Sequence, residues 1–318
     1  MTNASQGQVV VLAGGLSPER DVSIRSGRRV ADALRVVGVD ATVLDVDATL
    51  LATLGEQEPA CVVPLLHGAP GEDGAIRDVL VALGLPFVGS GPAACRRAFD
   101  KPIASSLVEA AGVSVPASMA LPHATFRELG AGAVLEAVVA RLGLPLMVKP
   151  TRGGSSLGAT VVRSGADLPA AMVAAYAYGE IALVEAFVRG TEVAVSVVED
   201  ADGLRALPIV EVVPDGGFYD YGARYTAGAT EFFVPARLPD DVLAACAEAA
   251  VTVHRTLGLR DWSRSDLIVD AAGTPWFLEV NVAPGMTETS TYPQAVAAAG
   301  LDLGAVTASL VDRAVSRG

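Results

Sequence analysis

Two short apolar segments joined by a turn carry the sharpest chemical signal in the sequence. Residues 263–270 (SRSDLIVD) and 275–281 (PWFLEVN) predict the two strands of an antiparallel hairpin. If the turn centres on residues 272–273, Asp266 lies directly opposite Glu279 on the neighbouring strand. Two facing carboxylates repel each other, and burying them is costly unless a cation lies between them.

The same strand face adds an amide and a guanidinium, because residues two apart in a strand point to one side. In this register Asn281 lies opposite Arg264. Ligands that are all oxygens select Mg²⁺ or Mn²⁺ rather than zinc, so we predict a divalent-metal site formed by Asp266, Glu279 and Asn281. The alternative is a solvent-facing strand with scattered charges. The opposite face is predicted to be core and carries Leu267, Val269, Trp276, Leu278 and Val280.

A turn follows the hairpin directly, in residues 282–290 (VAPGMTETS). Pro284 and Gly285 favour a tight turn, which presents backbone N–H groups beside the metal site. Ser290 adds a hydroxyl shortly afterwards. Donors next to a divalent cation would stabilise an oxyanion, although Pro-Gly turns are also common in loops that do no chemistry.

A glycine-rich segment, residues 149–158 (KPTRGGSSLG), follows a short apolar strand. Its glycines permit close approach of the backbone to a ligand, and Ser155 and Ser156 add donors. The segment lacks the GKS/T ending of a Walker loop and does not match GxGxxG. We interpret it as a phosphate-covering loop, and a flexible linker is the alternative.

Lysine is rare in this chain, in which 21 of the 23 basic residues are arginine. The two lysines are Lys101 and Lys149, and Lys149 opens the glycine-rich segment. Arginine and lysine are not equivalent at every site, so the pattern indicates a need for a compact ammonium group at these two positions. Chance retention is the alternative.

Four further features are candidates on weaker grounds. Glu185 ends an apolar strand and would accept hydrogen bonds from a base or ribose, unless it is a plain strand-end charge. Residues 218–225 (FYDYGARY) form either a water-excluding lid or a packed surface loop. His67 opens the glycine-rich loop 67–74, where a structural and a site role are both open. Glu19, in the first turn of a helix, is explained equally well by the helix dipole.

Composition bounds the class of protein. The 318-residue chain is 51% hydrophobic and 19% charged, which is typical of a globular protein of two or three domains. A formal net charge of −13 disfavours a general nucleic-acid binder. Three cysteines without CxxC spacing argue against a disulfide framework or a cysteine zinc site. We see no secretory leader and no uninterrupted apolar run of about 20 residues, so we expect a soluble, cytoplasmic protein.

Strand and helix patterns alternate through the first hundred residues and predict a parallel sheet with sites at its strand ends. The predicted strands are 8–13, 41–45, 60–66 and 86–88, and the predicted helices are 17–37 and 74–83. A second unit, from about residue 100, has the predicted helix 102–111 and the strands 118–121, 146–149, 160–163 and 181–185. A third has the strands 192–199 and 207–213, the helix 240–257, the hairpin and a helix after residue 302.

Taken together, these segments resemble the D-alanine–D-alanine ligases of the ATP-grasp superfamily over residues 9–310. The motifs that carry the resemblance are GGLSPERDVS (14–23), HGAPGEDG (67–74), FDKP (99–102), VKPTRGGSSLG (148–158), FYDYGARY (218–225), SRSD (263–266) and LEVNVAPGMTETS (278–290). The resemblance implies an α/β (mixed α+β) fold with a three-domain ATP-grasp architecture. Its parts would be an N-terminal parallel α/β domain for the first substrate (1–98), a central ATP-grasp subdomain (99–187) and a C-terminal ATP-grasp subdomain with the metal and second-substrate sites (188–318).

The resemblance also implies where ATP and metal bind. Lys101 and Lys149 would contact the phosphates of ATP, Glu185 the adenosine moiety and Glu192 the ribose. The full ATP-binding set would be Lys101, Lys149, Ser156, Glu185, Glu192 and Arg224. Two Mg²⁺ or Mn²⁺ ions would be held by Asp266, Glu279 and Asn281.

Substrate contacts follow from the same resemblance. Glu19 would bind the ammonium group of the first D-alanine, and His67 would lie near its carboxylate. Arg264 and the backbone N–H of Gly285 would stabilise the tetrahedral intermediate. The remaining implied contacts are Ser290 and Thr291 at the second amino acid, and Ser155 and Tyr225 in a lid closed over the site.

The implied reaction starts with phosphorylation of one D-alanine carboxylate by ATP, because oxide is a poor leaving group. The amine of a second D-alanine then attacks the acyl phosphate. The products would be D-alanyl-D-alanine, ADP and phosphate, for peptidoglycan synthesis. The implied partners are D-alanine, ATP and a second copy of the chain in a homodimer.

Several positions depart from the usual family pattern. Arg224 stands where the lid usually has lysine, which keeps the charge. Thr291 stands where leucine or methionine is usual, so the alternative is a ligase that takes D-serine or another amino acid as second substrate, as in an antibiotic pathway. Ala69 and Pro70 replace a common Arg-Gly pair, whereas Tyr225 argues against a D-lactate ligase. A nucleotide-binding scaffold without turnover is the alternative from another class, and the complete set of lysines and metal ligands argues against it.

Overall fold

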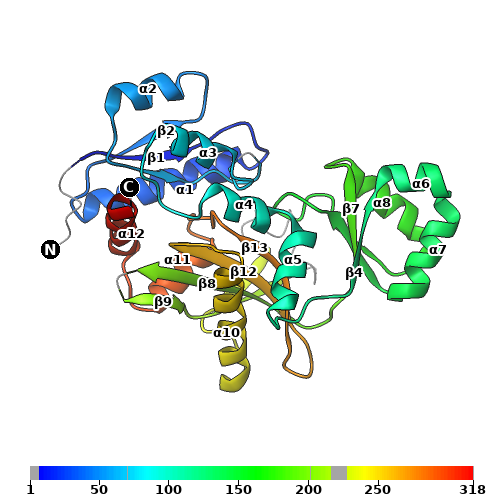
Figure 1. Ribbon diagram of the computed structural model, residues 1–318. Coiled ribbons are helices and arrows are strands. Elements are labelled where there is room, and N and C mark those ends of the chain that lie inside the picture. The colour runs from blue at the N-terminus through cyan, green and yellow to red at the C-terminus, as the bar shows by residue number, and fades with distance from the viewer. Residues whose placement is uncertain (1–6, 70, 201, 216–227, 318) are drawn as a thin grey trace.

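Three β-sheets organise the chain, as seen in a computed structural model that describes residues 7–69, 71–200, 202–215 and 228–317 (Figure 1). A small parallel sheet lies at the N-terminus, a four-stranded antiparallel sheet forms a separate lobe, and a six-stranded antiparallel sheet lies between them. The expected mixed α/β architecture is therefore confirmed.

The N-terminal sheet has the strand order β2-β1-β3 and is parallel. Its strands are β1 (Val9–Ala13), β2 (Ala41–Asp45) and β3 (Cys61–Pro64). Its helices are α1 (Arg20–Val36), α2 (Leu50–Gln57) and α3 (Ala75–Ala82). Every residue of β1 is buried, as expected for a strand covered on both faces. Helix α1 packs closely on β1 because Gly27 has no side chain: a Cβ there would lie 2.5 Å from the Cβ of Ala13.

Three sequence-based boundaries change in this region. The predicted strand 86–88 makes only a single bridge, between Val62 and Phe87, because the chain meets β3 there for one residue. The predicted strand 60–66 ends at Pro64, and α1 begins at Arg20 rather than at Ser17.

The four-stranded sheet has the order β4-β7-β5-β6. Its strands are β4 (Ser118–Pro122), β5 (Leu146–Pro150), β6 (Thr160–Val162) and β7 (Ile181–Ala186). Its helices are α6 (His123–Leu129), α7 (Ala131–Leu142) and α8 (Leu168–Tyr176). Strand β5 alternates: Leu146 and Val148 pack in an apolar core that α7 and α8 share, whereas Met147 and Lys149 point to the opposite face of the sheet. That opposite face is therefore available to line a site.

The six-stranded sheet runs β11-β10-β8-β12-β13, with β9 paired to β8. Its strands are β8 (Thr191–Asp200), β9 (Gly203–Ala206), β10 (Val210–Pro214), β11 (Thr230–Phe233), β12 (Trp262–Val269) and β13 (Pro275–Asn281). One core joins it to α4 (Pro92–Phe99), α5 (Lys101–Ala110) and α10 (Asp240–Thr256), and another to α11 (Thr291–Ala298) and α12 (Leu303–Arg317). Helix α12 also packs along α1, which ties the C-terminus to the N-terminal sheet (Figure 1). Helix α5 thus packs on this sheet, although the predicted central subdomain 99–187 groups it with the four-stranded one. The division of the chain at residues 98 and 187 is a proposal.

The hairpin of β12 and β13 confirms the predicted pairing of its polar residues. Asp266 pairs with Glu279, and Arg264 pairs with Asn281. Just beyond Asp266 the register shifts, so that Leu267 faces a residue one position closer to the turn than the regular pairing predicts. Such a β-bulge turns the following side chains to the other side of the strand.

The bulge makes part of the predicted hairpin core wrong. Trp276 and Leu278 were expected in the core, but both are half-buried, and Phe277 is the fully buried residue in their place. Leu278 instead lines a cavity together with its neighbour Glu279.

Within the described ranges, no single helix has both the length and the apolar character needed to cross a membrane. The pair α11 and α12 reaches the required length and composition only when taken together, and its two helices are bent by 102°.

Candidate active site

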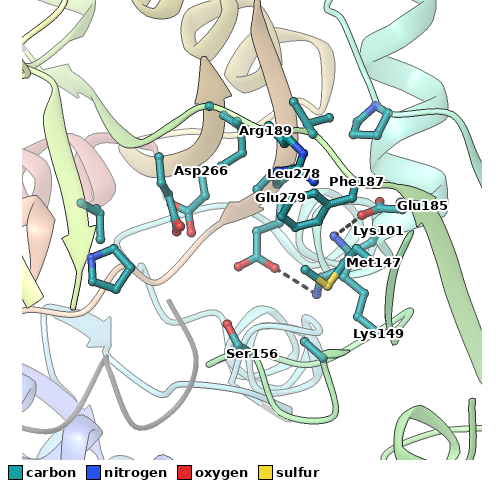
Figure 2. Close-up of a pocket in the computed structure, with 18 of the residues that line it drawn as sticks. Lys101, Met147, Lys149, Ser156, Glu185, Phe187, Arg189, Asp266, Leu278 and Glu279 are labelled. Carbon is teal, nitrogen blue, oxygen red and sulfur yellow. Dashed lines mark ion pairs between the residues drawn. The ribbon is translucent and has the colours of Figure 1, made fainter. Parts of the chain in front are cut away.

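A cavity of about 540 Å³ lies between the four-stranded and six-stranded sheets (Figure 2). Its charged lining includes Lys101, Lys149, Glu185, Asp266 and Glu279, which come from four strands and the start of one helix. Apolar surface is provided by Met147, Phe187 and Leu278. A cavity with one apolar wall and several converging charged groups is typical of a site for a ligand that combines a ring with phosphates.

Both lysines of the chain point into this cavity and form ion pairs there (Figure 2). The Nζ atom of Lys101 lies 3.1 Å from Oε2 of Glu279 and also donates to the carbonyl oxygen of Gly153 at 2.7 Å. The Nζ atom of Lys149 lies 2.7 Å from Oε2 of Glu185, on the adjacent strand. The strand alternation that buries Val148 therefore places the ammonium group of Lys149 in the cavity.

The glycine-rich segment forms one rim of the cavity and is anchored to the start of α5. The backbone N–H of Lys101 donates to Thr151 O at 3.0 Å, and Arg152 forms an ion pair with Asp100 at 2.9 Å. Ser155 and Ser156 have φ values of 52° and 57°, so the segment turns sharply at both serines.

The same segment reaches the N-terminal sheet. The hydroxyl of Ser155 donates to Oε1 of Glu19, the residue just before α1. A Cβ on Gly154 would lie 3.2 Å from Oε2 of Glu19, which shows how closely the two segments approach. Ser155 and Glu19, 136 positions apart in the chain, thus lie side by side at the edge of a second cavity.

That second cavity has a volume of about 100 Å³ and adjoins the first. The two share Lys101, Asp266 and Glu279 in their walls. Among the other residues that line the second cavity are Glu19, His67, Glu72, Ser155, Arg264, Asn281, Gly285, Ser290 and Thr291. Charged groups that stabilise a phosphate in the large cavity would therefore act next to whatever molecule occupies the small one.

The predicted metal ligands lie together on the face of the hairpin shared by both cavities. The guanidinium of Arg264 binds Asp266 through two hydrogen bonds, of 2.6 and 2.8 Å. Oδ1 of Asn281 accepts from the backbone N–H of Ala283 at 2.7 Å. These oxygen donors fit a hard divalent cation such as Mg²⁺, and their negative charge is balanced here by Arg264 and Lys101.

In the described part of the chain, no three His, Cys, Asp or Glu side chains come together in a group that could hold a metal ion. The set proposed here has only two carboxylates and completes its donors with an amide. The metal site therefore remains a proposal that rests on oxygen donors of the hairpin.

The turn after the hairpin holds the hydroxyl of Ser290 in place. The Oγ atom of Ser290 accepts from the backbone N–H of Thr287 at 3.0 Å and lies 2.9 Å from the Thr287 hydroxyl. A Cβ at Gly285 would lie 2.7 Å from the same Oγ atom, so a larger residue there would displace the Ser290 hydroxyl. The backbone of Gly285 and the hydroxyl of Ser290 are consequently held next to each other at the wall of the small cavity.

His67 connects the N-terminal sheet to this turn. Its Nδ1 lies 3.0 Å from Ala283 O, which can only accept, so Nδ1 carries the proton. Its Nε2 then accepts from the hydroxyl of Ser26, which accepts in turn from the backbone N–H of Met286 at 3.0 Å. Burial, with a smaller contribution from the charge of Arg264, lowers the pKa of His67 to about 4, so the ring is neutral near pH 7.

The structure places most of the predicted residues at one site. Glu192 lines both cavities, Ser156 and Glu185 line the large one, and Thr291 lines the small one. Arg224 and Tyr225, with the rest of the predicted lid, lie outside the described residues.

Sequence reasoning missed several residues of the site. Met147, Phe187 and Leu278 line the large cavity but carry no polar signal in the sequence. Met147 points there through the alternation of β5 and Leu278 through the bulge, while Phe187 directly follows β7. Glu72 lies within the glycine-rich loop 67–74, in which the sequence predicts only His67 as a candidate site residue. Its burial at the small cavity follows from packing between distant segments and is invisible in the loop itself.

Comparisons with known proteins agree with this geometry. The family described as D-ala D-ala ligase C-terminus matches residues 107–312. The D-alanine–D-alanine ligase of Anaeromyxobacter sp. (strain K) is 41% identical over 92% of both chains. That of Bordetella petrii is 40% identical over 98% of this chain and 93% of the relative.

Two solved structures share the fold over nearly all of the chain. The VanG D-Ala:D-Ser ligase from Enterococcus faecalis aligns with a TM-score of 0.81 and 27% identity, over 97% of this chain and 98% of its own. The D-alanine–D-alanine ligase from Bacillus anthracis, solved in complex with ATP, aligns with a TM-score of 0.79 and 23% identity, over 98% of both chains.

Proposed function

The chain belongs to the D-alanine–D-alanine ligase family, and from that premise we propose that it joins two D-alanine molecules at the expense of ATP. The observation that carries the proposal is the shared wall of the two cavities, formed by Lys101, Asp266 and Glu279. A nucleotide bound in the large cavity would have its phosphate end beside the small polar cavity. The products are D-alanyl-D-alanine, ADP and phosphate, the dipeptide being a building block of peptidoglycan.

ATP fits the large cavity by chemistry. The adenine ring would pack against Met147, Phe187 and Leu278, while Glu185 accepts hydrogen bonds from the adenosine moiety and Glu192 from the ribose. Lys101, Lys149 and Ser156 would bind the phosphates, and Arg224 would join them from the lid. Binding exchanges the ion pairs Lys101–Glu279 and Lys149–Glu185 for contacts with the ligand.

The mechanism follows from the poor leaving ability of oxide. A carboxylate oxygen of the first D-alanine attacks the terminal phosphorus of ATP and forms an acyl phosphate, with the charge in transfer neutralised by the lysines. When bound by Asp266, Glu279 and Asn281, Mg²⁺ or Mn²⁺ would supply further charge neutralisation.

Residues of the small cavity would hold the two amino acids. Glu19 binds the ammonium group of the first D-alanine and His67 lies near its carboxylate, while Ser290 binds the second carboxylate. Arg264 and the Gly285 N–H stabilise the tetrahedral intermediate formed when the second amine attacks. Ser155, already bonded to Glu19, closes the site together with Tyr225, which keeps water away from the acyl phosphate.

One observation favours a second candidate substrate. The hydroxyl of Thr291 is buried at the small cavity and has no hydrogen-bond partner among the described residues. A buried hydroxyl without a partner is costly, and the side-chain hydroxyl of D-serine would satisfy it. We propose D-serine as the alternative second substrate.

The test is amino-acid-dependent release of ADP, with the product identified by mass spectrometry from a panel of D-amino and D-hydroxy acids. We expect D-alanine to stimulate ADP release and D-alanyl-D-alanine to be the main product. If another amino acid stimulates release and D-alanine does not, the proposed substrate is wrong.

The assembly and location implied by the resemblance complete the proposal: a homodimer that acts in the cytoplasm on small-molecule substrates. Light scattering at micromolar concentration tests the first part. A mass of one chain at that concentration contradicts the homodimer.

A further inference from the structure

Glu72 is one of five acidic side chains that line the small cavity, with Glu19, Glu192, Asp266 and Glu279, and it is the one that the function proposed above does not use. It is 8% exposed and lines the cavity together with Glu19 and Arg264. Its Oε1 accepts from the backbone N–H of Gly68 at 3.0 Å. Within the described residues no lysine, arginine or histidine forms an ion pair with it, in contrast to Glu185, Asp266 and Glu279.

The loop around Glu72 holds the carboxyl group in place. Gly68 lies next to two acidic side chains. Its N–H donates to Glu72, and a Cβ on it would lie 2.7 Å from Oε2 of Glu19. On the other side, the fully buried Arg77 donates to the carbonyl oxygen of Gly71, the residue directly before Glu72. The position of Glu72 is therefore fixed by contacts on both sides.

The charges that face Glu72 come from three other segments. Burial raises its pKa most, the carboxylates of Glu19 and Glu279 raise it further, and the Gly68 hydrogen bond and Arg264 lower it, for a pKa of about 8. A carboxyl group with this pKa exchanges its proton in the range where enzymes work.

One proton transfer in the ligase reaction has no residue assigned to it in the proposed function. The second amino acid arrives as an ammonium ion, which has no lone pair and cannot attack a carbonyl carbon. Resting on the proposed function, we propose that Glu72 is the general base that takes this proton, and is thus a further catalytic residue of the reaction. The carboxylate would contact the amine of the second amino acid in the small cavity.

The step balances in protons and electrons. Ionised Glu72 accepts one proton from the ammonium group, and the freed nitrogen lone pair forms the C–N bond while the carbonyl π pair moves to oxygen. When that electron pair re-forms the C=O bond, the bond between the carbonyl carbon and the phosphate oxygen breaks. The second nitrogen proton leaves on the phosphate as HPO₄²⁻, and Glu72 returns its own proton to solvent.

Two neighbouring candidates for this base are already engaged. Nε2 of His67 accepts from Ser26 and Nδ1 donates to Ala283, so His67 has no free lone pair in this arrangement. Glu19 accepts from Ser155 and is assigned to the ammonium group of the first substrate. Of the other acids that line the cavity, Glu192 is assigned to the ribose, and Asp266 and Glu279 are assigned to the metal. Glu72 is the acid that is left without a role.

Hydroxylamine separates this role from others, because it is a nucleophile that is mainly unprotonated at neutral pH. With ATP and D-alanine, the enzyme should form D-alanyl hydroxamate from the acyl phosphate. In Glu72→Gln, which keeps the acceptor for Gly68, we expect dipeptide formation to fall by about 100-fold or more. Hydroxamate formation should stay within a few-fold of the unmodified enzyme.

The pH profile gives a second readout. The dipeptide rate should rise with pH through the pKa of Glu72 in the loaded site, near or below 8 because bound cations favour the ionised carboxyl. In Glu72→Gln, this rise of the dipeptide rate with pH (the limb assigned to Glu72) should be absent. Asp73→Asn removes the same charge from the same loop but not from the cavity, and should keep both the rate and the limb.

Three results would overturn the proposal. An equal loss of dipeptide and hydroxamate would show that Glu72 acts before the amine attacks. A raised KM for the second amino acid with an unchanged kcat and pH limb would make it a binding residue, and an unchanged rate would remove it altogether. If Glu72→Gln does not fold, Glu72→Asp, which retracts the carboxylate, should show the same selective loss, and a parallel loss of both products contradicts the role.

The proposed function fails differently. If the unmodified enzyme forms neither dipeptide nor hydroxamate from D-alanine, the ligase assignment is wrong, whatever the variants do. If it forms both and the variants show no selective loss, only the role of Glu72 is wrong.

Discussion

The large and the small cavity share one wall but balance their charges in different ways. In the large cavity, Glu185 and Glu279 each lie within 3.1 Å of a lysine ammonium group. In the small cavity, Glu72 is also buried and has no cationic side chain bonded to it among the described residues. A paired carboxylate can release its lysine to phosphate, whereas burial raises the pKa of the unpaired Glu72. The difference assigns charge neutralisation to one cavity and proton exchange to the other.

The largest effect should come from the shared wall. Asp266→Asn removes a carboxylate that both cavities use and should lower kcat by about 10³-fold, because metal binding contributes several kcal/mol to the stabilisation of the transferring charge. Isothermal titration of Mg²⁺ in the presence of ADP should show a weaker affinity. Asp312→Asn, on α12, removes the same charge away from both cavities and is the control. Unchanged ATP consumption in Asp266→Asn contradicts the metal assignment.

The paired character of the large cavity can be broken by removing one partner. Lys149→Met leaves the buried Glu185 without its cation and should lower the free energy of unfolding by roughly 3 kcal/mol. Adding Glu185→Gln removes the remaining charge and should recover most of that stability but not the ATP affinity. Urea unfolding and nucleotide titration of both variants measure this. Equal stability of the single and double variants means that the pair is not coupled.

Acid should destabilise the junction that His67 makes. Its pKa is about 4 in the folded protein and near 6.5 when unfolded, so stability is lost as pH falls from about 6.5 to 4. The contribution is roughly 3 kcal/mol over that range. His67→Gln should make the acid loss smaller by this amount, as measured by urea unfolding at pH 7 and pH 4.5.

His254 is the built-in control for that measurement. Its pKa is also lowered to about 4, mainly by burial, and it lies away from both cavities. His67→Gln should not change the free energy of unfolding that is lost at low pH through protonation of His254. An acid profile that is the same with and without His67 contradicts the buried neutral histidine.

The smallest effect concerns the unpartnered hydroxyl at the small cavity. Thr291→Leu removes it and should shift the preference between D-serine and D-alanine as second substrate toward D-alanine by about tenfold. Competition between the two amino acids, with both dipeptides quantified by mass spectrometry, gives the ratio directly. A ratio that does not change means that Thr291 does not contact the second side chain.

Local patterns predicted the part of the site that depends on local geometry. The pairing of Asp266 with Glu279 follows from strand alternation and turn position, and the structure has it. The bulge one residue further on has no clear sequence signal, and it decides that Leu278 lines the large cavity while Phe277 enters the core. Alternation alone therefore gave the correct pairing and a partly wrong core.

Features that depend on distant segments could not be read from the sequence. The burial of Glu72 results from the approach of β12, β13 and α1 to its loop, and no pattern within residues 67–74 contains that information. The packing of α5 on the six-stranded sheet is likewise a long-range property. The glycine-rich surroundings of His67 made it a candidate, and it lines the small cavity. Its bonds to Ser26 and Ala283 form only where the N-terminal sheet meets the hairpin turn.

The central claim is that the two cavities act as one ligase site through an acyl phosphate. Oxygen-18 in the carboxylate of D-alanine tests it most directly, because the attacking oxygen leaves with phosphate when the amide forms. Mass spectrometry of the inorganic phosphate should find one labelled oxygen for each dipeptide made. Unlabelled phosphate accompanying dipeptide formation would contradict the account.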